Sequence, residues 1–98
     1  MYYRLRLVNY FDVWGNEKDG WDVNNACEEW NDVWTCDLDD KTLLKILKST
    51  GFLQKHVRTN QLIFDWIGPE CCEILTRRNR YPLGRIDIID WKYDEEGD

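Results

Sequence analysis

Polar and apolar residues alternate along the first ten positions of the chain. The apolar side of this segment, which runs from Tyr2 to Tyr10, carries Tyr3, Leu5 and Leu7. A period of two is typical of a β-strand with one buried and one partly wet face. The next stretch, residues 12–21, holds two glycines and an Asp-Gly pair. It predicts a turn that leads into a second strand at Trp21.

A different period marks residues 40–50. Apolar side chains recur there at helical spacing, namely Leu43, Leu44, Ile46 and Leu47. Asp39 or Asp40 is suited to cap the first turn, and Gly51 is suited to end the helix. Because so short a helix is marginal in water, it is expected to pack on a sheet.

Residues 25–36 are ambiguous. Read as a helix, the segment places Ala26, Trp30, Val33 and Trp34 on one side. Read as a strand, it has no cleanly apolar face. The pattern favours an irregular or bulged strand, and the helix remains the alternative.

Three further strands are predicted at residues 61–67, 72–77 and 85–91. The Gly68-Pro69 pair separates the first two, and a loop over 78–84 joins the last two. The resulting order is β-β-α-β-β-β. It predicts an α+β fold, with an antiparallel sheet of about five strands and one helix packed on a face. We expect one domain over residues 1–93 and an acidic tail over 94–98.

The net charge of −6 is unevenly distributed. Between Asp12 and Asp40 there are ten acidic residues and one base, Lys18. A net-acidic chain is repelled by phosphate, so a protein with a basic surface is the expected partner and direct nucleic-acid binding is disfavoured. No apolar run approaches a membrane span, and the first residues lack the pattern of a signal peptide. A cytoplasmic location with no membrane partner is therefore expected.

Six tryptophans are many for 98 residues. Trp66 and Trp91 fall in predicted strands and are expected in the core. Trp30 and Trp34 lie among acidic residues, so they either form a protein-binding hot spot or cap the open face of the sheet. The candidate partner-binding residues are Glu28, Glu29, Trp30, Asp32, Trp34, Asp37 and Asp39.

A basic cluster supports an alternative. Its residues, Arg77, Arg78, Arg80, Tyr81 and Arg85, could hold a nucleic-acid backbone and stack a base. The net charge opposes this function, and Glu73 and Asp87 are suited to pair with these arginines across strands.

No catalytic or metal-binding pattern is present. The four cysteines are Cys27, Cys36, Cys71 and Cys72, whose spacing does not match a zinc site. They are expected to be plain thiols, since disulfides are rare in the cytoplasm. The single histidine, His56, is expected in a solvent-facing loop. The chain is therefore predicted to be no enzyme and to need no cofactor.

Three segments carry a resemblance. They are Asn9-Tyr-Phe-Asp-Val-Trp-Gly-Asn, Asp19-Gly-Trp-Asp-Val-Asn-Asn and Tyr81-Pro-Leu-Gly-Arg-Ile. The pattern resembles a group of short uncharacterised proteins from Firmicutes and their phages and mobile elements. The resemblance implies an inhibitor of host defence, anti-CRISPR proteins included, that blocks a nucleic-acid-handling effector by steric and electrostatic occlusion.

The third possibility is a structural or accessory homodimer formed through an exposed strand edge, and monomer and homodimer both stay open.

Overall fold

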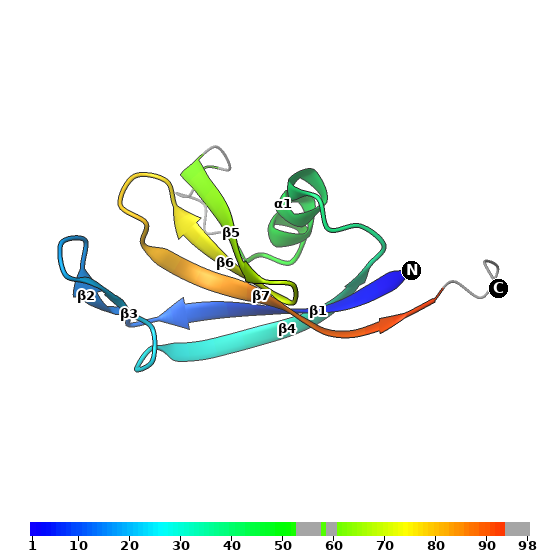
Figure 1. Cartoon of the computed structure of the whole chain (residues 1–98), viewed down its shortest axis with the longest axis horizontal. Coiled ribbons are helices and arrows are strands. Elements are labelled where there is room, and N and C mark those ends of the chain that lie inside the picture. Colours follow the sequence, from blue (N-terminus) through cyan, green and yellow to red (C-terminus); the bar gives the residue numbers. More distant parts are fainter. Residues whose placement is uncertain (53–57, 59–60, 94–98) are drawn as a thin grey trace.

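The computed structural model describes residues 1–52, 58 and 61–93, and shows one twisted antiparallel sheet with a helix on one face (Figure 1). The five strands of this sheet lie in the order β4-β1-β7-β6-β5. Their bounds are β4 (Cys27–Thr35), β1 (Tyr2–Phe11), β7 (Pro82–Lys92), β6 (Cys71–Thr76) and β5 (Leu62–Gly68). All four pairings are antiparallel. The predicted α+β class is confirmed at this level.

The predicted turn contains a short strand of its own, and the second strand predicted at Trp21 pairs with it in a separate two-stranded ribbon. Four strands therefore precede the helix, where the predicted order β-β-α-β-β-β has two. The ribbon consists of β2 (Trp14–Asn16) and β3 (Gly20–Asp22), and it lies at the end of the molecule away from the helix (Figure 1). The Trp21 indole Nε1 donates a hydrogen bond of 3.1 Å to the carbonyl of Asn79, and its ring packs edge-on against Tyr81. These two contacts fasten the ribbon to the turn between β6 and β7.

The helix α1 (Asp40–Ser49) agrees with the prediction. The Thr42 amide donates to the Asp39 carboxylate at 2.8 Å, which satisfies one of the free N–H groups of the first turn. Gly51 follows the helix with a φ of 74°, a conformation that a side chain disfavours. No helix in the described part of the chain is long and apolar enough to cross a membrane.

The core lies between α1 and one face of the sheet. Leu43 and Leu47 of the helix are fully buried against it. The sheet and the segment after the helix contribute Leu5, Leu7, Phe52, Leu62, Cys72, Ile74, Ile86 and Ile88. Since side chains alternate along a strand, the remaining positions point to the opposite face. We call that face, on the side away from α1, the open face.

The ambiguous segment is a regular strand. Each residue of β4 pairs with β1, from Tyr3 opposite Thr35 to Phe11 opposite Cys27, without a shift in register. Both the helical alternative and the expected bulge are therefore wrong. Pairing with a strand far away in the sequence decides the structure, because local propensity is weak in this segment.

Two other expectations need correction. Trp66 and Trp91 lie in strands but are 38% and 51% exposed, so neither is a core residue. Trp91 lies where β7 pairs only with β1, since the pairing of β7 with β6 reaches no further than Asp87. The predicted loop over 78–84 is also too long, because β7 begins at Pro82. His56 and the acidic tail over 94–98 lie outside the described residues.

Candidate protein-binding face

Four of the seven predicted partner-binding residues share the open face. Glu28, Trp30, Asp32 and Trp34 alternate along β4, and each lies opposite a residue of β1. Their β1 partners are Tyr10, Val8, Arg6 and Arg4, in that order. The period of two in a strand, rather than helical spacing, brings these side chains together.

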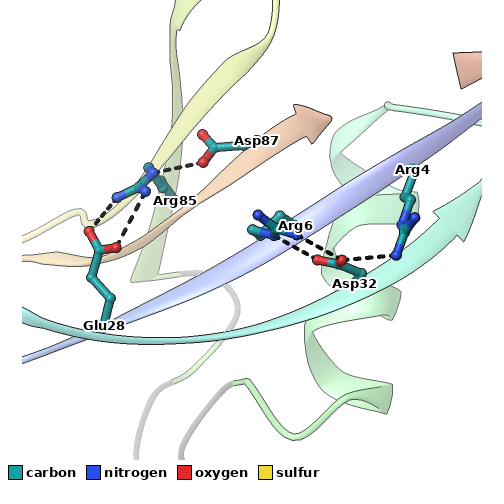
Figure 2. A network of polar contacts seen from close by, with 6 residues as sticks. All are labelled: Arg4, Arg6, Glu28, Asp32, Arg85 and Asp87. Carbon is teal, nitrogen blue, oxygen red and sulfur yellow. Dashed lines mark hydrogen bonds and ion pairs between the residues drawn. The ribbon is translucent and has the colours of Figure 1, made fainter. Parts of the chain in front are cut away.

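Asp32 is held by two arginines of the neighbouring strand (Figure 2). Its Oδ1 accepts from Arg6 Nε at 2.9 Å, and its Oδ2 accepts from Arg4 Nη2 at 3.1 Å. The hydrogen bond from Arg6 is the main reason that the pKa of this carboxyl lies below its usual range. Arg6 also lies over the Trp30 ring, 5.6 Å from its centroid. One acid thus orders two arginines, and one of these supports a tryptophan.

Arg85 is the centre of a second network that joins three strands, and Figure 2 shows its contacts with Glu28 and Asp87. It donates to Glu28 at 2.7 Å on β4, to the Tyr10 hydroxyl at 3.0 Å on β1, and to Asp87 at 2.9 Å on its own strand. Hydrogen bonding to Glu28 is the largest cause that raises the pKa of Arg85. The Tyr10 hydroxyl is partly buried, and this burial raises its pKa. Glu28 is therefore ion paired, and it shares the single positive charge of Arg85 with Asp87.

Lys92 supports the other tryptophan. Its Nζ lies 4.8 Å from the centroid of the Trp34 ring and 5.9 Å from that of Tyr2. Even so, Trp30 and Trp34 stay 57% and 46% exposed. Two large rings are thus held in place by cations of the same chain while much of their surface still faces solvent. Ordered, exposed aromatic rings are what a protein-binding hot spot requires.

The other three predicted residues lie elsewhere. Glu29 pairs with Asn9 and belongs to the face that carries α1. Asp37 accepts a hydrogen bond from the amide of Leu38, and Asp39 caps the helix. The hydrogen bond from Thr42 lowers the pKa of Asp39. These two aspartates therefore shape the start of α1 and do not join the cluster on β4.

The predicted basic cluster is divided between two places. Arg85 belongs to the network above, whereas the other three arginines line a cleft of about 700 Å³ beside the ribbon. This cleft is formed by Glu17, Gly20, Trp21, Val23, Asp65, Glu73, Leu75, Arg77, Arg78, Asn79, Arg80 and Pro82. Arg80 lies 3.4 Å from Asp65, and three acidic residues balance the three arginines. Tyr81 packs on Trp21. The cleft is not a strongly positive surface, which disfavours the nucleic-acid alternative.

The expected cross-strand pairing of the arginines is only partly correct. Glu73 lies opposite Arg85 in the register, but Arg85 forms ion pairs with Glu28 and with Asp87, which lies two positions along its own strand. Sequence reasoning also missed the roles of Arg4, Arg6 and Lys92. The alternation in the first strand already placed Arg4 and Arg6 opposite the apolar face, but their acid partner depends on the register with β4.

The cysteines are free thiols without an evident chemical role. Cys71 and Cys72 point to opposite faces, as expected, and Cys72 is fully buried in the core. Burial is the largest cause that raises their pKa values, to about 11 and about 12, so both stay protonated at neutral pH. Within residues 1–52, 58 and 61–93, no group of three or more Cys, His, Asp or Glu side chains is placed to hold a metal ion.

Comparison of the chain with known protein families, with curated proteins and with solved structures gave no match. The resemblance to short proteins of phages and mobile elements therefore stays a prediction. Any functional conclusion rests on the geometry of the open face.

Proposed function

We propose that this chain acts by binding another protein through the β4 side of the open face. The observation that carries the proposal is the exposure of Trp30 and Trp34 on one ordered strand. Each ring is supported by a cation, Arg6 in one case and Lys92 in the other. Such rings bury a large area on binding at a small cost in conformational entropy.

The partner in this proposal has a basic surface. The chain carries a net charge of −6, and much of the acidic surplus lies on and around the β2–β3 ribbon. Asp12, Glu17, Asp19 and Asp22 form no ion pair with another described residue. These acids would attract a basic partner at long range, which increases the association rate and makes it sensitive to salt. Trp30 and Trp34 would supply the contact area.

A narrower version of the proposal is a stoichiometric inhibitor of a nucleic-acid-handling defence effector. It is supported by the acidic charge and by the resemblance to proteins of phages and mobile elements. An acidic protein of this size could occupy a basic channel that normally holds DNA or RNA. This version includes no catalytic step, cofactor or membrane, and it places the chain in the cytoplasm with its target.

The test is a pull-down from the native host with tagged protein, with and without nuclease, read by mass spectrometry. The bait is compared with the double variant Trp30→Ala/Trp34→Ala and with Trp14→Ala. Trp14 is the matched control, because it is 68% exposed but lies on the ribbon. We expect the wild-type bait to capture a basic protein that stays bound after nuclease treatment. The double variant should fail to capture this protein, and the Trp14→Ala control should capture it.

Equal capture by all three baits would contradict the proposed face. Recovery of nucleic acid alone would instead favour the arginine-lined cleft. The role of charge is best tested at Glu17, an exposed acid between β2 and β3, because Glu28 and Asp32 are ion paired and their reversal would also disturb the fold. For Glu17→Lys we expect slower association and a weaker dependence on salt.

A further inference from the structure

The β4 strand forms an edge of the sheet, and its outer side has no strand partner among the described residues. It is nine residues long and pairs with β1 without a register shift. Proteins usually protect such edges with lysine, proline or a bulge, because an open edge is a template for another strand. None of these is present in β4, whose charged residues are Glu28, Glu29 and Asp32.

Two of these three acids already form ion pairs within the chain. Arg4 and Arg6 hold Asp32, and Arg85 holds Glu28. Repulsion between two β4 edges is therefore much weaker than the sequence suggests. Only Glu29 has no ion pair with another described residue.

We propose that two copies of this chain pair through β4, antiparallel, with Asn31 opposite Asn31 of the second copy. A two-fold axis perpendicular to the sheet makes such a contact self-complementary. In this register Glu28 faces Trp34, Glu29 faces Val33 and Trp30 faces Asp32. All nine residues of β4 are paired and no acid faces another acid.

Other registers are less favourable. Asn31 is the central residue of β4, so this register alone pairs all nine residues. An axis at Trp30 or Asp32 leaves two residues of β4 unpaired, and an axis at Glu29 or Val33 leaves four. An axis at Glu29 also sets this acid, which has no ion pair with another described residue, opposite its own copy, and like charges directly opposite each other destabilise a strand pair. The length and the charge pattern of β4 thus favour one pairing, which joins the two five-stranded sheets into one and places both open faces on the same side.

The inference goes beyond the proposed function and is tested on the chain alone, by sedimentation velocity. The wild type should show a reversible monomer–dimer equilibrium between about 1 μM and 1 mM, a range that covers weak association. Asn31→Asp and Asn31→Lys each place two like charges opposite each other, and each should weaken the dimer by about fivefold. Asn24→Asp and Asn24→Lys are the matched controls, since Asn24 is exposed and lies outside β4.

An equimolar mixture of Asn31→Asp and Asn31→Lys should recover dimer, because Asp and Lys then face each other across the axis. Circular dichroism checks that both variants keep the fold, as expected for an exposed position. A wild type that stays monomeric up to about 1 mM would overturn the inference. The proposed register would also be overturned if the Asn31 variants dimerised as well as their Asn24 controls, or if mixing them gave no recovery.

Discussion

The two faces of the sheet are built in opposite ways. The face under α1 is apolar and closed, with Leu5, Leu7, Leu43 and Leu47 fully or almost fully buried. The open face buries Val8 and Tyr10 but is otherwise held by ion pairs and by cations that lie over aromatic rings. Burial of apolar area is the main source of stability, whereas partly exposed ion pairs contribute little. The comparison indicates that one face maintains the fold and that the other can be changed, or can bind, at small cost.

The largest expected effect is on the helix-covered face. Leu47→Ala should lower the free energy of unfolding by about 2–5 kcal/mol, because it leaves a cavity between α1 and the sheet. Trp34→Ala is the matched truncation on the open face and should cost less than about 1 kcal/mol. Urea unfolding followed by circular dichroism measures both. Equal losses would show that the two faces do not differ as proposed.

A second prediction concerns the close packing of β7 against β1 and the Phe52 ring. A Cβ atom on Gly84 would collide with the carbonyl oxygen of Val8 and would lie 2.6 Å from the Phe52 ring. Gly84→Ala should therefore destabilise the fold by about 1–3 kcal/mol. Gly68→Ala is the control, since no atom lies within 4 Å of the added methyl group. If both variants unfold at the same urea concentration, the close approach at Gly84 does not limit the packing.

On the open face, the largest effect is expected at Arg85. Arg85→Met removes the contacts with Glu28, Tyr10 and Asp87 but keeps much of the apolar part of the side chain. The expected loss is about 1 kcal/mol, as for a partly exposed ion pair with good geometry. Arg78→Met also removes one positive charge, but at the exposed turn between β6 and β7, and it should leave the free energy of unfolding almost unchanged. A loss at Arg85 as large as that of Leu47→Ala would mean that the ion pairs, too, maintain the fold.

The sequence predicted the helix and the first strand well because their signals are local. The cap at Asp39, the stripe through Leu43 and Leu47 and the stop at Gly51 lie within thirteen consecutive residues. The sequence also shows three acids near two tryptophans on residues 28–34, and it left open whether these rings form a hot spot or cap the sheet. The structure shows that Trp30 and Trp34 are exposed and share one face.

The ion pairs and the burial of individual strand residues depend on contacts between positions that are far apart in the sequence. Asp32 meets Arg6 across 26 positions of sequence, and Glu28 meets Arg85 across 57, so neither pair could be assigned without the register. For the same reason an acidic segment was predicted where the structure has neutralised pairs. Trp91 was expected in the core from its strand pattern, but whether a strand residue is covered depends on which neighbours extend past it.

The smallest effect concerns acid pH. The hydrogen bond from Arg6 lowers the folded-state pKa of Asp32, so the stability from this contact is present above the unfolded pKa of about 4. It is lost as the pH falls through the folded value, where Asp32 becomes protonated. Asp32→Asn should therefore be less stable than the wild type at pH 7, and the difference should shrink below about pH 4.

Urea titrations at pH 7, 4 and 2.5 measure this difference in stability. A repeat at pH 7 in 1 M NaCl separates the contribution of the charge from that of side-chain packing. Because the ion pair is partly exposed, salt should also reduce the advantage of the wild type, whereas the cost of Leu47→Ala should persist. Parallel pH profiles for the wild type and Asp32→Asn would contradict the role of this carboxylate. A difference that closes with both acid and salt would show that the open face is stabilised by screened charges, which a basic partner could rearrange when it binds.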